Sequence, residues 1–246
     1  MIYFYSGTPG SGKSLSMAQY AEFWVKKLGK NIITNTFIDR NAILKKNKSG
    51  GQIFYYENEE ITPDLLITYA LKNHDIGKEG QTLIIFDEAQ VKFSPTAVKL
   101  KCQENKNYRM EWLDFFTQHR HLGYDILMIS QFDRLIDPQI RVLFEYNYIH
   151  RKANNLGTLG LLLSILHITF FVQVKKWYGV NEAIGTKFFF YKKKYAKIYN
   201  SYAYRDQIIK KLEAKYGKEK MSELMGFRSK KKINKILFLP GDKKMF

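Results

Sequence analysis

The sequence contains little cysteine and no recognisable secretion or zinc-binding signal. Cys102 is the only cysteine among 246 residues, so an internal disulfide is excluded and a reducing compartment is favoured. The opening residues, MIYFYSG, lack a basic segment, and their apolar run is too short for a signal peptide. The five histidines show no spacing typical of a zinc site. These absences disfavour a secreted, disulfide-stabilised protein and a zinc enzyme.

Acidic residues are also scarce, and the imbalance is concentrated late in the chain. The sequence has 23 Asp and Glu against 40 Lys and Arg, a formal net charge of +17. Residues 1–186 hold 22 basic and 18 acidic side chains, or +4, whereas residues 187–246 hold 18 and 5, or +13. This asymmetry predicts a boundary near Lys187 and a basic tail that binds phosphate, either in nucleic acid or on an anionic membrane. An ordinary solvated surface is the alternative interpretation.

A glycine-rich segment near the start predicts a phosphate site. The residues GTPGSGKS follow the apolar run IYFY and match the P-loop (Walker A) pattern G-x-x-x-x-G-K-S/T. Glycines let backbone N–H groups approach phosphate oxygens, and the amphipathic residues that follow predict a helix whose amino end favours anions. We expect ATP and Mg²⁺ as cofactors, with Lys13 at the β- and γ-phosphates and the Ser14 hydroxyl on the metal. The predicted nucleotide-binding residues are Gly7, Thr8, Pro9, Gly10, Ser11, Gly12, Lys13, Ser14 and Leu15.

A second motif, LIIFDEAQ, places two carboxylates after an apolar strand. The continuous apolar run is typical of a central strand that is buried on both faces. Asp87 and Glu88 then fall at its carboxyl end, where open α/β sheets bind ligands. This Walker B pattern predicts that Asp87 holds the hydration shell of Mg²⁺ and that Glu88 orients the attacking water or accepts its proton. A helix N-cap pair is the alternative for these two acids.

The order of the expected elements predicts the fold class. Apolar patterns predict strands at 2–6, 31–35, 52–56, 82–88, 125–131 and 146–150, and helices at 13–28, 63–74 and 108–121. Residues 39–51 and 74–81 are expected to be polar connections. Alternating strands and helices predict an α/β fold, a P-loop NTPase with a mainly parallel sheet and helices on both faces.

Further candidate residues follow the strand at 125–131. It ends on Gln131, whose amide is suited to contact the γ-phosphate or to position water. An arginine that stabilises transition-state charge is also expected, with Arg141 preferred over Arg120 and Arg134. His119 and His121 point to different faces of a predicted helix and are expected to be structural or exposed. The predicted catalytic residues are Lys13, Glu88, Gln131 and Arg141.

Taken together, these motifs resemble the zonular occludens toxin (Zot) family of filamentous-phage assembly ATPases. Many ATPases share the first two motifs, and the family-specific part is QHRHLGYDILMISQFDRLIDPQIRVLFEYNYIHRK. The lysine-rich KFFFYKKKYAKIYNSY is also similar, so the resemblance covers residues 1–205. It implies an additional-strand P-loop fold of the FtsK and RecA class, a role in virion assembly and export at the host inner membrane, and nucleotide machinery made of Lys13, Ser14, Asp87 and Glu88.

One departure from the family concerns the membrane. Longer members follow the ATPase domain with a membrane span and an extracytoplasmic domain, whereas this sequence stops after INKILFLPGDKKMF with no downstream stretch able to span, which disfavours the toxin-like and pore-connecting roles. Residues 156–174, LGTLGLLLSILHITFFVQV, approach the length of a span. Their second half favours a strand that pairs with TKFFFY, so a short buried helix or loop followed by a hairpin is preferred over a membrane segment.

These patterns divide the chain into three parts. They are a P-loop ATPase core at 1–155, a hairpin with an aromatic and lysine-rich extension at 156–205, and a basic tail at 206–246 that begins with a predicted helix at 206–217. Four tyrosines of the extension recur at helical spacing, which favours packing on the core over stacking on the bases of single-stranded DNA. They are Tyr191, Tyr195, Tyr199 and Tyr202.

The function indicated is an ATP-hydrolysing motor for inovirus assembly and export. Expected partners are phage coat or assembly proteins, further copies of the chain in a homo-oligomer, single-stranded DNA, and the inner face of the host cytoplasmic membrane. The alternatives are a P-loop ATPase that translocates or packages DNA and a non-catalytic nucleotide-binding adaptor at the membrane. A small-molecule kinase would not need Glu88 directly after Asp87, and a GTP switch would need a base-reading motif that TKFF and NKIL lack.

Overall fold

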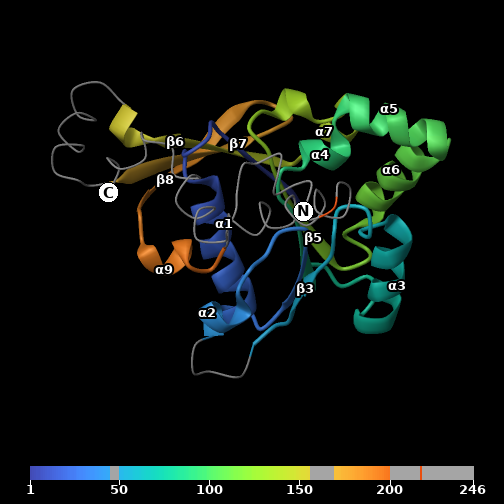
Figure 1. Ribbon diagram of the computed structural model, residues 1–246, viewed down its shortest axis with the longest axis horizontal. Helices are drawn as coiled ribbons and strands as arrows, with labels where there is room; N and C mark the ends of the chain where they lie inside the picture. The colour runs from blue at the N-terminus through green and yellow to red at the C-terminus, as the bar shows by residue number, and fades with distance from the viewer. Residues whose placement is uncertain (45–49, 156–168, 200–216, 218–246) are drawn as a thin grey trace. The chain divides into compact units, whose positions relative to one another are not determined.

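One eight-stranded sheet organises the protein, in the order β3-β2-β4-β5-β1-β6-β7-β8. The computed structural model describes residues 1–44, 50–155, 169–199 and 217 (Figure 1). The first six strands of that order, from β3 at the edge to β6, pair in parallel. Strands β7 and β8 add an antiparallel hairpin beside β6. The predicted α/β fold with a mainly parallel sheet and a hairpin is thereby confirmed. The strands are β1 (Ile2–Ser6), β2 (Asn31–Thr34), β3 (Ile53–Tyr55), β4 (Thr82–Phe86), β5 (Tyr124–Ile129), β6 (Tyr146–Lys152), β7 (Phe170–Trp177) and β8 (Glu182–Phe190).

Helices cover both faces of the sheet, as predicted. In Figure 1, α3, α5 and α6 group together on the side away from α1 and α9. The two sides correspond to two separate buried clusters, one containing residues of α3 and α6 and the other containing residues of α1. The helices are α1 (Lys13–Glu22), α2 (Arg40–Leu44), α3 (Pro63–Asn73), α4 (Gln90–Phe93), α5 (Pro95–Glu104), α6 (Tyr108–Gln118), α7 (Pro138–Arg141) and α9 (Lys193–Ala196).

The alternation of side chains along the strands explains the two clusters. Phe4 packs toward α6 and its Trp112, whereas the next residue, Tyr5, packs toward α1 and its Met17. Every residue of the central strand β4 is buried, which accounts for its continuous apolar run. The strands that carry the predicted site are therefore fixed from both sides.

Several predicted boundaries are wrong by part of an element. The helix expected over 13–28 is an α-helix only to Glu22 and continues as a π-helical turn, Phe23–Lys27. The strand expected over 82–88 ends at Phe86, and the polar connection expected over 39–51 contains α2. Helix α5 was not anticipated, although Ser94 caps it through the N–H of Ala97 and a proline occupies its first turn.

The extension after the hairpin is helical over part of the stretch in which tyrosines recur at helical spacing. Among its described residues, Lys193–Ala196 is helical, and Tyr199 forms an isolated bridge with Ile38. Tyr195 and Tyr199 pack against the cluster beside α1, which confirms core packing for these two, while Tyr191 is exposed. Tyr202 and the predicted helix at 206–217 lie outside the described residues, apart from Gly217.

The segment considered as a membrane span is described only in part. Its first residues, 156–168, lie outside the described residues, and residues 170–174 belong to β7. In the part of the chain that the structure describes, no helix combines the length and the apolar character that a membrane crossing requires. Residues Met1–Asn200 form one compact unit. The three-part division of the sequence stays a prediction.

Candidate functional site

The glycine-rich loop turns from the carboxyl end of β1 into the amino end of α1. Gly7, Gly10 and Gly12 have positive φ angles of 144°, 74° and 95°. A Cβ atom at Gly7 would lie 2.4 Å from the carbonyl oxygen of His150, and one at Gly12 would lie 2.7 Å from the ring of Phe171. The loop therefore requires glycine both for its backbone angles and for the neighbours that pack on it.

Lys13 begins α1 and points back across the loop. Its Nζ donates hydrogen bonds to the carbonyl oxygens of Gly7, at 2.6 Å, and Thr8, at 3.2 Å. Within the described part of the chain, no side chain caps the amino end of α1, so its first N–H groups are left for a ligand. Burial lowers the pKa of Lys13, and the charges of Glu88 and Asp87 oppose that shift. A cation and helix N–H groups thus meet at one loop, which suits a bound triphosphate.

The two predicted carboxylates follow β4 in a turn near this loop. Asp87 is half-buried, whereas Glu88 is exposed and has a φ of 47°, which is uncommon outside glycine. Burial, and secondarily the charge of Glu88, raises the pKa of the Asp87 carboxyl to about 6. Helix α4 starts after Ala89 with no side-chain cap among the described residues. The N-cap alternative for the two acids is therefore wrong. Asp87 Oδ1 accepts a hydrogen bond from the N–H of Glu88 at 3.0 Å, and Glu88 Oε2 accepts one from Nε2 of Gln90.

Asn35, directly after β2, holds the turn that presents these carboxylates. Its Oδ1 accepts a hydrogen bond from the backbone N–H of Asp87 at 2.7 Å, and its Nδ2 donates to the carbonyl oxygen of the same residue at 2.8 Å. The Nδ2 group also donates to Oδ1 of Asn58 at 2.7 Å. One side chain thereby satisfies both backbone groups of Asp87. Sequence reasoning missed Asn35, although a polar residue after a parallel strand is the same signal that singles out Gln131.

Replacing Asn35 by alanine should lower the rate constant of ATP turnover by roughly tenfold. Two hydrogen bonds are lost and leave partly buried backbone groups unpaired, which costs about 1–3 kcal/mol and loosens the turn that aims Asp87 and Glu88. Turnover and the thermal unfolding temperature should be measured together. Asn73→Ala is the control, because the Asn73 amide donates only to a carbonyl within its own helix. Normal turnover in a folded Asn35→Ala protein would refute this role.

The raised pKa of Asp87 predicts a pH dependence for binding of nucleotide with Mg²⁺. The ionised carboxylate attracts the cation, so affinity should be full well above pH 6 and should fall as the pH drops through about 6 and Asp87 is protonated. Titrations of ATP with and without Mg²⁺ over this range measure the effect. The Asp87→Asn variant should bind weakly throughout and show only the titration of ATP itself. An unchanged pH profile in that variant would contradict the assignment.

Strand β5 brings Gln131 to the phosphate loop. It lies between β1 and β4 and pairs in parallel with both. The N–H of Gly7 donates to the carbonyl oxygen of Gln131 at 3.0 Å. Gln131 also lines a cleft of about 360 Å³ together with Gly7, Thr8, Asp133 and Arg151. A strand inserted between the Walker A and Walker B strands is the arrangement implied by the additional-strand class, and it places Gln131 beside the site.

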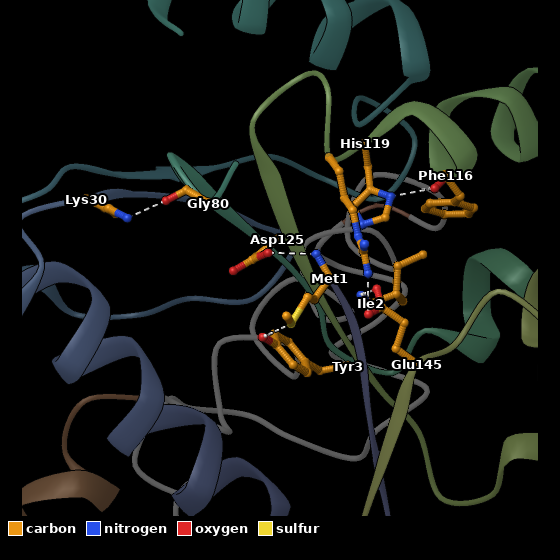
Figure 2. Close-up of polar contacts among 10 residues, drawn as sticks. Met1, Ile2, Tyr3, Lys30, Gly80, Phe116, His119, Asp125 and Glu145 are labelled. Atoms are coloured by element: carbon orange, nitrogen blue, oxygen red, sulfur yellow. Dashed lines mark hydrogen bonds and ion pairs between the residues drawn. The ribbon is translucent and has the colours of Figure 1, made fainter. Parts of the chain in front are cut away.

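The three candidate arginines lie in different places. Arg120 pairs with Glu145, whose carboxylate also accepts a hydrogen bond from the N–H of Ile2 at 3.1 Å (Figure 2). This pairing holds Arg120 at the amino ends of the strands, whereas the phosphate loop lies at their carboxyl ends. Arg134 is exposed in a short 3₁₀ turn, and Arg141 ends α7 half-buried. Arg120 therefore does not serve the site of its own chain, and the role of Arg141 stays a prediction.

The segments QHRHLGYD and IDPQIR contribute to the fold. His119 is buried, and its Nδ1 bonds the carbonyl oxygen of Phe116 (Figure 2). Burial lowers the pKa of His119 to about 4, and His121 is exposed, so the expectation of structural or exposed histidines is confirmed. Asp137 caps α7 by accepting from the N–H of Gln139 at 3.0 Å and pairs with Arg109 at 3.1 Å.

The hydroxyl and carboxyl groups of the site fit a magnesium ion that is bound largely through phosphate. Ser14 is half-buried in the first turn of α1, and the surroundings of Asp87 disfavour its charge, which a cation would neutralise. No group of three or more His, Cys, Asp or Glu in the described ranges could hold a metal ion alone. Mg²⁺ in nucleotide sites takes one or two protein oxygens together with phosphate and water, so Ser14 and Asp87 suffice.

Comparison with known proteins identifies the family. The sequence model of the family described as zonular occludens toxin (Zot) matches residues 1–206. The chain belongs to the Zot family. Among curated protein sequences, none is significantly similar to this Zot-family chain.

Solved structures resemble the Zot-family chain at low sequence identity. A solved ATPase domain is 9% identical over 81% of this chain and 84% of its own, with a TM-score of 0.51. The N-terminal domain of zonular occludens toxin from Neisseria meningitidis is 20% identical over 81% and 98%, with a TM-score of 0.47. The genome-packaging NTPase of Sulfolobus turreted icosahedral virus 2, in complex with ATP-gammaS, is 14% identical over 76% and 95%, with a TM-score of 0.40. The likeness to the solved ATPase domain agrees with the parallel sheet of the Zot-family chain and supports the α/β fold of a P-loop NTPase.

Proposed function

We propose that this Zot-family chain is an ATP-hydrolysing motor that drives assembly and export of a filamentous phage (inovirus) at the inner face of the host cytoplasmic membrane. The observation that carries the proposal is the meeting of Lys13, Asp87, Glu88 and Gln131 around one glycine-rich loop. These residues offer phosphate binding, metal binding and water activation at one edge of the sheet. Membership of the Zot family supports the phage context.

The site divides the work of hydrolysis among its own residues. The N–H groups of the loop and the Lys13 ammonium bind the phosphates, and Ser14 and Asp87 hold the metal. The metal held by Ser14 and Asp87 would supply positive charge that offsets the charge of the phosphate groups. Glu88 is exposed, and although its Oε2 accepts a hydrogen bond from Nε2 of Gln90, the carboxylate would orient the attacking water and accept its proton. Gln131 contacts the γ-phosphate or that water from β5.

In a homo-oligomer, a neighbouring subunit would supply the positive charge that hydrolysis requires beyond Lys13 and the metal. Transition-state charge on the γ-phosphate is stabilised in many motors by an arginine of a neighbouring subunit. Arg141 is the candidate for that role, because α7 carries it outside the phosphate loop of its own chain. Arg141→Ala should then reduce turnover without weakening ATP binding.

The basic tail supports contact with phosphate-bearing partners, and removal of residues 228–246 tests it. Residues 187–246 carry +13 of the net charge of +17, so the truncated protein should bind anionic vesicles or single-stranded DNA more weakly and with a smaller salt dependence. ATP binding should be unchanged, because its residues lie far upstream. Separate titrations at physiological salt distinguish the partners. Loss confined to vesicles supports the membrane-docked motor, loss confined to DNA supports a translocase, and no change in either refutes the tail's role.

The decisive experiment for the whole proposal is ATP turnover by the intact protein, with and without single-stranded DNA and anionic vesicles. A motor should release phosphate and respond to its partner, whereas an adaptor should bind ATP without turnover. In infected host cells, a turnover-deficient variant should block virion release while phage DNA and coat protein still accumulate. Normal release would refute the role in export.

A further inference from the structure

A buried chain of polar side chains joins β7 to both ends of the phosphate loop. Gln173 of β7 donates from Nε2 to Oγ of Ser16, in the second turn of α1, at 2.9 Å. The same Nε2 lies 2.9 Å from Nε2 of His150 in β6. His150 Nδ1 in turn lies 3.2 Å from the carbonyl oxygen of Ser6, the last residue before the loop. The chain therefore spans from the residue that precedes the loop to the helix that follows it.

The hydrogen bonds of this chain are mutually consistent. The two hydrogens of the Gln173 amide serve Ser16 Oγ and His150 Nε2, so His150 accepts at Nε2 and donates from Nδ1 to Ser6. That tautomer requires a neutral imidazole, and burial lowers the pKa of His150 to about 4. Gln173, His150 and Ser16 are all buried, with 5%, 1% and 6% of their surface exposed. Buried, satisfied networks of this kind hold their members in one arrangement.

Strand β7 contacts the loop at a second point. The ring of Phe171 lies over Gly12, and it forms a buried cluster with Leu15 of α1 and Phe189 of β8. The carbonyl group of His150 lies over Gly7 at the other end of the loop. Both ends of a segment that glycine makes intrinsically flexible are thus held from the same side, by β6 and β7.

We propose that Gln173 is a positioning residue for nucleotide binding, which acts through Ser16 and His150 to keep the two ends of the phosphate loop at the separation that a triphosphate requires. The inference rests on the proposed binding of ATP. A loop whose N–H groups already converge loses less conformational entropy when nucleotide binds. Gln173 hydrogen-bonds to Ser16 and His150, neither of which is assigned a part in hydrolysis, so its effect should fall on nucleotide binding and leave the chemical step intact.

The test compares Gln173→Met with Lys175→Met. Methionine nearly matches the length of glutamine but donates no hydrogen bond. Lys175 lies two positions along the same strand on the same face, where its ammonium covers the ring of Tyr146. We expect Gln173→Met to raise the KM and the Kd for ATP roughly five- to tenfold, the effect of losing one or two buried hydrogen bonds, with kcat within about threefold of wild type. Lys175→Met should leave all three constants near their wild-type values.

A second variant keeps the inference testable if Gln173→Met does not fold. Ser16→Ala removes the acceptor of the amide and should raise the Kd for ATP in the same direction. When both single variants fold, the double variant should bind ATP about as well as Gln173→Met alone, because both substitutions break the same hydrogen bond between Gln173 and Ser16. Strict additivity, or a wild-type Kd in a folded Gln173→Met protein with a lowered unfolding temperature, would show a purely structural role and overturn the inference. Failure of the wild-type protein itself to bind ATP would instead refute the proposed function.

Discussion

Lys13→Ala should abolish measurable ATP turnover and weaken ATP binding by roughly 10²-fold. In the proposed site the ammonium would make charge-assisted hydrogen bonds to the β- and γ-phosphates, each worth about 1.5–3 kcal/mol, and alanine cannot form them. The fold should survive, because Lys13 is half-buried and, within the described residues, its Nζ donates to two carbonyl oxygens of the loop itself. Phosphate release and ATP affinity are the measurements.

Lys26→Ala is the matched control for this change. It removes the same charge from an exposed position farther along the same helical segment, so it should leave turnover and affinity unchanged. The phosphate-loop assignment would be refuted by wild-type turnover in a Lys13→Ala protein that unfolds at its normal temperature.

Glu88→Gln should separate binding from chemistry. Glutamine keeps the size and most of the hydrogen bonding of glutamate but cannot accept a proton, so hydrolysis should fall by roughly 10²–10⁴-fold. Affinity for ATP with Mg²⁺ should stay within a few-fold of wild type, because Asp87, Ser14 and Lys13 are intact. Single-turnover phosphate release and equilibrium binding measure the two effects separately.

The control for the glutamate is Glu104→Gln. Glu104 is exposed on α5 and pairs with Lys101 at 2.8 Å, away from the loop, so its replacement should be silent. Loss of ATP binding in Glu88→Gln would show that Glu88 acts as a metal ligand. Unchanged hydrolysis would show that Glu88 takes no part in the chemical step.

The motifs of this site could be predicted from the sequence because their signals are local. GTPGSGKS requires glycine at fixed positions, and the apolar run of LIIFDEAQ reflects a strand that is buried along its whole length. Each pattern is set by contacts within a few residues, and a strand, a turn and a helix start follow from it. The same reasoning gave the extent of the first helical segment but not its change from an α-helix to the π turn Phe23–Lys27, because no proline or glycine lies within that turn.

The residues that sequence reasoning missed act through pairings between distant strands. Asn35 matters only because β2 lies beside β4, and Gln173 only because the hairpin folds back beside β6. Neither residue belongs to a local pattern, and an isolated Asn or Gln at the end or in the middle of a strand has many structural explanations. The tyrosine spacing of the extension predicted core packing, which Tyr195 and Tyr199 show, but the local conformation depends on distant contacts such as the bridge between Tyr199 and Ile38.

By itself, the sequence determined which groups are present for chemistry: a glycine loop, Lys13 and Ser14 before a helix, and Asp87 and Glu88 after a buried strand. Those assignments follow from backbone geometry and from the cost of burying charge, which act over a few residues. The tertiary structure alone decided which of them meet, because the order of strands in a sheet depends on long-range packing. It placed β5 between β1 and β4, brought Gln131 to Gly7, and bonded Asn35 to the backbone of Asp87 and Gln173 to Ser16 of α1.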